Sequence, residues 1–162
     1  MRLFVAVFPP DEISQDLRRR FVGAPARLTP VAQWHVTLAF IGEVGAERLP
    51  DVERALAAVT MPKGLELRLR GGGRFVRAGS TVLWAAVEGD LAALHADIRR
   101  RLDEVGLPYD GRDFTPHLTV AYADEAGVWQ ALDGYHGPPW VLDEIALVRS
   151  SPNEGYTRLK TW

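Results

Sequence analysis

The sequence contains an internal repeat in which an apolar run, a predicted helix and a second apolar run follow one another twice. The first copy begins at residues 3–7 and the second at residues 83–87, and each predicted helix carries three consecutive arginines near its end. The second run of each copy has the pattern His-apolar-Thr-apolar, at residues 35–38 and at residues 117–120. One such unit cannot bury its own apolar face, so two of them predict two similar lobes packed together.

The two His-Thr runs are predicted to be strands, in which successive side chains point to opposite faces. His35 and Thr37 therefore share one face of the first strand, and His117 and Thr119 share one face of the second. The residues on the opposite faces are apolar and are expected to lie in the core: Trp34, Val36, Leu38, Phe40, Leu118 and Val120. An approximate twofold relation between the lobes would bring the two polar faces together across one groove.

Hydrophobic periodicity assigns the rest of the chain to helices and strands. Helices are predicted at residues 11–22, 47–59, 90–105 and 126–132. Strands are predicted at residues 2–8, 65–69, 81–87, 140–148 and 156–162, in addition to the two His-Thr strands. Pro50 fits only in the first turn of its helix. Gly71–Gly73 followed by Phe75 indicate a turn or a bulge that leads into another short strand.

The composition is that of one globular domain covering residues 1–162. The net charge is −2, so any contact with nucleic acid would need a local basic patch. The chain has no cysteine, which excludes a disulfide, a thiol nucleophile and a cysteine metal site. No apolar run reaches membrane-spanning length and the N-terminal run has no cleavage site. We therefore expect a cytoplasmic protein that makes no membrane contact. We expect a monomer because no apolar stripe is left over beyond the predicted core.

Two histidines facing one substrate can divide the work of a general base and a general acid, because imidazole changes charge near neutral pH. Threonine hydroxyls beside them can donate hydrogen bonds to phosphate oxygens. A cyclic phosphodiester needs this set: one imidazole takes a proton from water, the other protonates the departing sugar oxygen, and the hydroxyls hold the phosphoryl group. The scheme uses neither a metal ion nor another cofactor, and neither motif is accompanied by a carboxylate at metal-ligand spacing.

The paired motifs resemble the signature of the two-histidine phosphoesterase superfamily. Their surroundings are similar to its RNA 2′,3′-cyclic phosphodiesterase branch, also called 2′-5′ RNA ligases. The matching stretches run from residue 2 to the C-terminal region: residues 2–7, 34–44, 71–75, 82–85, 114–120 and 150–156.

This resemblance implies an α+β fold of two pseudo-symmetric lobes, with antiparallel sheets and flanking helices around a central groove. It implies metal-independent hydrolysis of RNA 2′,3′-cyclic phosphate ends to 2′-phosphate, together with reversible 2′-5′ RNA ligation as an accompanying activity. Carried over to this sequence, His35 would protonate the departing 3′ oxygen and His117 would activate water. Thr37 and Thr119 would bind the phosphate oxygens.

One position departs from the family, which often has an arginine five residues after the second histidine. Tyr122 stands there in this chain. Either another cation serves, with Arg149, Arg77 and Arg74 as candidates, or the phosphate is held more by hydroxyl groups. Two other functions stay open: a phosphodiesterase of small cyclic nucleotides, and a catalytically weak module that binds RNA or nucleotides. The partner is accordingly RNA with a cyclic phosphate end or a cyclic nucleotide.

Several other residues have simpler interpretations. His95 is expected to pack on a helix face, and His136 to lie solvated in a loop rich in glycine and proline. Arg18–Arg20 and Arg99–Arg101 are expected at solvated helix ends, where cations favour the helix dipole. Core positions are expected for Phe40, Trp84 and Phe114, while Phe75 or Tyr156 could stack on a base at the groove rim.

Overall fold

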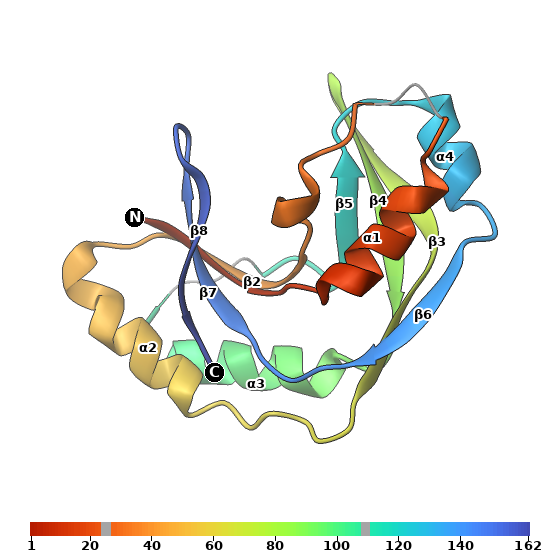
Figure 1. Cartoon of the computed structure of the whole chain (residues 1–162). Helices are drawn as coiled ribbons and strands as arrows, with labels where there is room; N and C mark the ends of the chain where they lie inside the picture. Colours follow the sequence, from red (N-terminus) through yellow and green to blue (C-terminus); the bar gives the residue numbers. More distant parts are fainter. Residues whose placement is uncertain (24–26, 108–110) are drawn as a thin grey trace.

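Eight strands form one antiparallel sheet in the computed structural model, which describes residues 1–23, 27–107 and 111–162 (Figure 1). Their order across the sheet is β6-β3-β4-β5-β2-β1-β7-β8. The strands are β1 (Arg2–Val7), β2 (Val36–Glu43), β3 (Glu66–Arg77), β4 (Ser80–Glu88), β5 (His117–Ala121), β6 (His136–Val141), β7 (Ala146–Ser151) and β8 (Gly155–Thr161).

The sheet has two halves, and the repeated units lie at its centre. β2 and β5 meet through the pair Val36 and Leu118. Outward from this joint, β1 pairs with β2 on one side and β4 pairs with β5 on the other, both antiparallel. The predicted α+β fold with two pseudo-symmetric lobes is confirmed, and the two predicted sheets are the halves of one continuous sheet.

The helices are exchanged between the halves (Figure 1). They are α1 (Asp11–Arg20), α2 (Leu49–Ala57), α3 (Ala92–Glu104) and α4 (Ala126–Leu132), with short 3₁₀ turns η1 (Val31–Gln33) and η2 (Ala46–Arg48). α1 follows β1 but contacts β6 of the other half, and α3 follows β4 but contacts β2 and α2. Each half therefore has its apolar face covered by a helix that begins in the other.

Polar contacts hold α1 in its exchanged position. The Tyr135 hydroxyl donates a hydrogen bond to Asp16 Oδ1 at 2.7 Å. Arg20 Nε donates to the carbonyl oxygen of Ala131 at 2.7 Å, and its Nη2 donates to that of Asp133 at 3.3 Å. Arg20 therefore binds the carbonyl end of α4 and is not simply a solvated residue at the end of its own helix, because α4 leaves its last carbonyls without helical partners.

Most predicted boundaries hold, but the predicted strand over residues 140–148 is wrong. β6 begins at His136 and ends at Val141, and β7 begins only at Ala146. His136 is exposed, as expected, but it is the first residue of a strand and not part of a loop. Pro138 and Pro139 fit within β6 because β6 is an edge strand and because its pairing with β3 shifts register between Arg68 and Arg70, which interrupts the ladder beside the two prolines.

The helix predicted at residues 47–59 is a 3₁₀ turn followed by α2, and Pro50 lies in its first turn as required. The helix predicted at residues 90–105 is α3, and Asp90 Oδ1 accepts a hydrogen bond from the backbone N–H of Ala92 at its start. Nowhere in the described ranges is a helix long and apolar enough to cross a membrane.

The glycine run at the centre of β3 forms the predicted bulge. The pairing of β3 with β4 shifts register between Leu69 and Gly72. A Cβ atom on Gly73 would lie 2.3 Å from the Trp84 ring, closer than side-chain atoms can approach. Gly73 is therefore needed so that the Trp84 ring can lie flat against β3.

Candidate active site

The register of the central strand pair brings the two His-Thr motifs together. Val36 lies opposite Leu118 in an antiparallel pair, so the same register places His35 beside Thr119 and Thr37 beside His117. Val36 and Leu118 are fully buried on one face, and the four polar side chains are half-buried on the other. We call this second face the site face. The structure thus gathers all four predicted site residues around one local twofold axis.

Each histidine has its ring orientation set by a backbone carbonyl two residues earlier. His35 Nδ1 lies 2.6 Å from the carbonyl oxygen of Gln33, and His117 Nδ1 lies 2.7 Å from that of Thr115. A carbonyl oxygen can only accept, so Nδ1 carries the hydrogen in both rings. In each histidine Nε2 is the nitrogen left for a substrate, as an acceptor when the ring is neutral and as a donor when it is charged.

Aromatic rings surround both histidines in similar ways. Tyr156 meets His35 edge-on with ring centroids 5.2 Å apart, and Phe75 meets His117 edge-on at 5.1 Å. A second ring tilts against each imidazole: Phe4 at 5.0 Å from His35 and Trp84 at 5.6 Å from His117. Among the described residues, a third ring neighbour is found only for His35, where Phe8 lies at 5.6 Å.

Burial lowers the pKa of both histidines below the usual value, since a charged imidazole loses hydration among these rings. The carbonyls of Gln33 and Thr115 act in the opposite direction by stabilising the charged rings. The charge of His117 lowers the pKa of His35 further, so the two rings interact electrostatically. Mutual repulsion favours the state in which the pair carries one proton, which is the state that acid-base catalysis by two imidazoles needs.

Phe40 was predicted to lie in the core, and this prediction is wrong. The pairing of β1 with β2 shifts register between Val5 and Ala6, so two neighbouring residues of β2, Leu38 and Ala39, are both buried. The alternation changes phase at this bulge, and Phe40 comes to the face of its partner Phe4 with 45% of its surface exposed.

Trp84 is also misplaced by the prediction, because its ring is a half-buried wall of the site face beside His117. Phe114 does pack against the core, as predicted. His95 packs as predicted too: its ring stacks on Phe114 at 4.0 Å, and its Nδ1 lies 2.7 Å from the carbonyl oxygen of Leu38.

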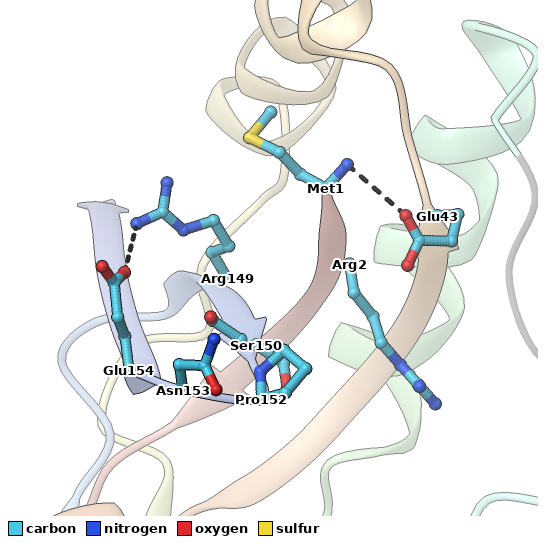
Figure 2. A pocket seen from close by; sticks show the side chains of 9 residues that line it. Met1, Arg2, Glu43, Arg149, Ser150, Pro152, Asn153 and Glu154 are labelled. Atoms are coloured by element: carbon cyan, nitrogen blue, oxygen red, sulfur yellow. Dashed lines mark hydrogen bonds and ion pairs between the residues drawn. The ribbon is translucent and has the colours of Figure 1, made fainter.

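Two of the three arginines expected as candidates to bind the phosphate form ion pairs with carboxylates. Arg149 pairs across strands with Leu3, a core residue, and therefore lies on the face opposite to His35. Its guanidinium forms an ion pair with Glu154 at 3.3 Å, as Figure 2 shows. Arg74 lies 3.5 Å from Asp124 and over the Trp129 ring.

The pocket drawn in Figure 2 is not the histidine site. Its volume is about 670 Å³, and it is lined by Met1, Arg2, Glu43, Arg149 and Ser150–Glu154. Arg2 pairs with Glu43 at one end of the β1–β2 ladder, whereas Val7 pairs with Val36, next to His35, at the other end. The pocket therefore lies a strand length away from the imidazoles.

Tyr122, at the position of the family arginine, faces Tyr156 of the other half. Although most of the Tyr122 surface is exposed, partial loss of hydration raises the pKa of its phenol, and the charge and hydrogen bonding of Tyr156 raise it further. The Tyr122 phenol is therefore neutral at physiological pH, and the pair can supply hydrogen bonds, but no positive charge, between the two halves.

A cation that the sequence reasoning missed lies on the site face. Arg158 of β8 pairs with Val148, and Val148 pairs with Phe4, so these three side chains share one face. The Arg158 guanidinium carbon lies 3.7 Å from the centroid of the Phe8 ring. The alternation of Tyr156 and Arg158 along β8 was the only signal in the sequence, and it does not say which residues the strand approaches.

The histidines, threonines and surrounding rings could perform acid-base chemistry on a phosphodiester. Two Nε2 atoms can exchange protons with a substrate, and two hydroxyls can donate to its phosphoryl oxygens. Among the residues that the structure describes, no three His, Cys, Asp or Glu side chains group together in a way that could hold a metal ion.

Comparisons with known proteins point to the same chemistry. The family model of the 2′-5′ RNA ligase superfamily matches residues 6–154. The RNA 2′,3′-cyclic phosphodiesterase of Thermus thermophilus is 34% identical over 169 residues, covering 93% of this chain and 82% of that protein.

Solved structures resemble the whole chain. A crystal structure of a Thermus thermophilus protein matches with a TM-score of 0.83 and 30% identity, over 100% of this chain and 97% of that one. The crystal structure of Escherichia coli LigT complexed with 3′-AMP matches with a TM-score of 0.77 and 27% identity, over 99% and 95%.

Proposed function

The chain belongs to the 2′-5′ RNA ligase superfamily, and from this premise we propose that it hydrolyses the 2′,3′-cyclic phosphate end of an RNA to a 2′-phosphate. The observation that carries the proposal is the Val36–Leu118 register, which puts two imidazoles and two threonines on one face. Relatives that carry the name RNA 2′,3′-cyclic phosphodiesterase support the substrate class.

In the proposed reaction, neutral His117 accepts a proton at Nε2 from a water molecule as the water oxygen attacks phosphorus. The bond from phosphorus to the 3′ oxygen breaks, and protonated His35 donates its Nε2 proton to that oxygen. The product keeps the phosphate on the 2′ oxygen, and the two histidines have exchanged protonation states. Thr37 and Thr119 donate hydrogen bonds to the non-bridging oxygens, where charge is held in the transition state.

The direction of proton transfer follows the family resemblance. Both Nδ1–H groups donate to backbone carbonyls, so each Nε2 is available for the role assigned to it. We propose no metal ion or other cofactor for any step, because the four side chains supply both proton transfers and the contacts to phosphate.

The same groups support ligation as a further proposal. A 5′-hydroxyl of a second RNA would take the place of water, lose its proton to His117 and form a 2′-5′ linkage. The bond broken is again the one to the 3′ oxygen, so the reverse reaction uses the same residues with their roles exchanged.

We also propose that residues 1–162 act as one domain and as a monomer in the cytoplasm, without contact to membranes. Support for one domain comes from α1 and α3, each of which packs on the opposite half. Support for a monomer comes from the large exposed apolar side chains, which belong to different elements and connections: Val22, Phe40, Val76, Tyr122, Trp129 and Val141. Sedimentation of the purified chain tests the oligomeric state.

The test of the proposed function is a product assay in EDTA with a short RNA that ends in a 2′,3′-cyclic phosphate. We expect conversion to a terminal 2′-phosphate, abolished by His117→Ala and retained by His136→Ala, whose imidazole is exposed on β6. Binding of the same RNA without conversion would instead support a nucleotide-binding module. Equal rates for the RNA and for a cyclic mononucleotide would favour an enzyme of small cyclic nucleotides.

A further inference from the structure

The proposed reaction determines on which side of the site the nucleoside lies. In an in-line displacement at phosphorus, the attacking and leaving oxygens lie on opposite sides of the phosphoryl group. His117 holds the attacking water, so the ribose that bears the leaving 3′ oxygen lies on the His35 side. The rest of an RNA chain must then run over the half that contains β1, β7 and β8. This step rests on the proposed function.

That half carries an unusual cation next to His35. Arg158 lies on the site face with its guanidinium carbon 3.7 Å from the Phe8 ring centroid, and the Phe8 ring is 5.6 Å from His35. The side chain is exposed, and within the described part of the chain no carboxylate forms an ion pair with it. By contrast, Arg74 of the other half lies in ion-pair distance of Asp124.

The Phe8 ring limits what this guanidinium can bind. An aromatic face attracts a cation through its quadrupole, and this contact holds the guanidinium beside the Phe8 ring. Within the described residues, no hydrogen bond or ion pair engages the N–H groups of this guanidinium. Their planar fork matches two oxygens of a phosphate, a geometry that a lysine ammonium does not offer.

We propose that Arg158, held against Phe8, binds the phosphodiester that joins the terminal nucleotide of the RNA to its 5′ neighbour. The reacting cyclic phosphate occupies the space between the two histidines and the two threonines. Arg158 lies beyond His35 on the side where the ribose leaves, so the next phosphate along the chain is the one within its reach. The protein therefore distinguishes an RNA end from a cyclic mononucleotide, which has no such phosphate.

The test compares two substrates, a 2′,3′-cyclic mononucleotide and a dinucleotide with a 2′,3′-cyclic phosphate end. We expect the wild type to prefer the dinucleotide in kcat/KM. Arg158→Gln should lower kcat/KM for the dinucleotide about tenfold or more, mainly through KM, with a much smaller loss for the mononucleotide. Raising the salt concentration should weaken the preference of the wild type and have less effect on the variant.

Two further variants sharpen this result. Arg158→Lys keeps the charge without the planar fork, and we expect an intermediate loss with the dinucleotide. Arg18→Gln is the matched control, because Arg18 is an exposed arginine of α1, and α1 packs on the core and not on the site face. It should leave the preference for the dinucleotide unchanged.

Equal losses for both substrates in Arg158→Gln would overturn the proposal, since Arg158 would then act on the reacting phosphate or on folding. Unchanged rates for both would overturn it as well. A binding measurement separates this failure from a failure of the proposed function: titrate a mononucleotide and a dinucleotide, each ending in 2′-phosphate, into the wild type and Arg158→Gln. Weaker binding confined to the dinucleotide supports the proposal even without turnover, and equal binding overturns it.

Discussion

The two halves of the site share the imidazole contacts of the chain repeat and differ in the strands and side chains that approach from outside the repeat. In both halves Nδ1 donates to the carbonyl of the residue two positions earlier, and an aromatic residue of β1 or β4 tilts against the ring. The edge-on ring comes from β8 in one half and from β3 in the other.

The difference between the halves shows where asymmetry can arise in a duplicated fold. Phe8 and Arg158 gather on the His35 side. Among the described residues, the His117 side has an edge-on ring in Phe75 as the counterpart of Tyr156, but no third ring against the imidazole. The repeat thus supplies two equivalent proton carriers. Residues on the outer strands and just after β1 then give one side a cation and an extra ring, and this directs the nucleoside to that side.

The largest expected effect comes from removing either imidazole. His35→Ala and His117→Ala should each lower the hydrolysis rate about 10²- to 10⁴-fold, the usual contribution of a general acid or base. The comparison becomes sharper with a phosphodiester of p-nitrophenol, because nitrophenolate leaves without needing a proton. With that substrate, the rate of His35→Ala should come much closer to the wild-type rate, whereas the rate of His117→Ala should stay low.

Rates on the two substrates check this assignment directly. If His117→Ala, and not His35→Ala, regains its hydrolysis rate on the nitrophenyl substrate, then His117 is the general acid and His35 the general base. A variant that keeps near-normal turnover of the cyclic phosphate would remove that histidine from the chemistry.

A smaller loss of activity is expected from a substitution that displaces a ring packed against His117. Gly73→Ala forces a methyl group to within 2.3 Å of the Trp84 ring, which must move, and Trp84 contacts His117. We expect about a tenfold loss of kcat/KM and a destabilisation of about 1–3 kcal/mol from overpacking. Urea denaturation and steady-state rates measure the two effects.

Gly111→Ala is the matched control, because a Cβ there meets no atom within 4 Å and the backbone is not left-handed. Full activity in Gly73→Ala together with unchanged stability would show that the Trp84 ring can adjust without disturbing His117.

The pH dependence should reflect the burial of both rings. The active pair carries one proton, so kcat/KM should be bell-shaped. Since burial lowers both pKa values in the free enzyme, the maximum should lie below the ordinary histidine value of about 6.5. Phe75→Ala exposes His117 to water and should move one limb of the profile toward higher pH, whereas Val76→Ala, at a 68% exposed neighbour, should move neither.

The free energy of unfolding should also depend on pH through the protonation of the two histidines. Below about pH 6.5 the unfolded chain binds protons that the buried histidines resist, so the free energy of unfolding falls as the pH decreases and levels off above that value. Denaturation at several pH values measures this slope, and a flat response from pH 5 to 7 would contradict the burial of the imidazoles.

The smallest expected effect concerns the exchange of helices between the halves. Tyr135→Phe removes the 2.7 Å hydrogen bond to Asp16 of α1 and should destabilise the protein by about 1 kcal/mol. For a chain of this size the melting temperature should fall by about 2–4 °C, with catalysis unaffected. Asp16→Asn alone and combined with Tyr135→Phe completes a double-mutant cycle, and strictly additive losses would show that the two groups do not interact.

The sequence by itself determined the parts of the protein that depend on local periodicity. Alternation with period 2 placed His35 and Thr37 on one face, and the repetition at His117 and Thr119 indicated that this face has a function. The order of apolar runs and helices predicted two similar halves, and Pro50 and the glycine run marked a helix start and a bulge. These features are local because they follow from backbone geometry over a few residues.

Only the tertiary structure decided the features that depend on partners far along the chain. A bulge in the β1–β2 pairing turns Phe40 out of the core, although the alternation of β2 alone places it inside. The cation beside His35 comes from Arg158, and its position over Phe8 depends on the packing of β7 between β1 and β8. Register between strands and the direction of long side chains are set by cross-strand packing, which no pattern within a single strand contains.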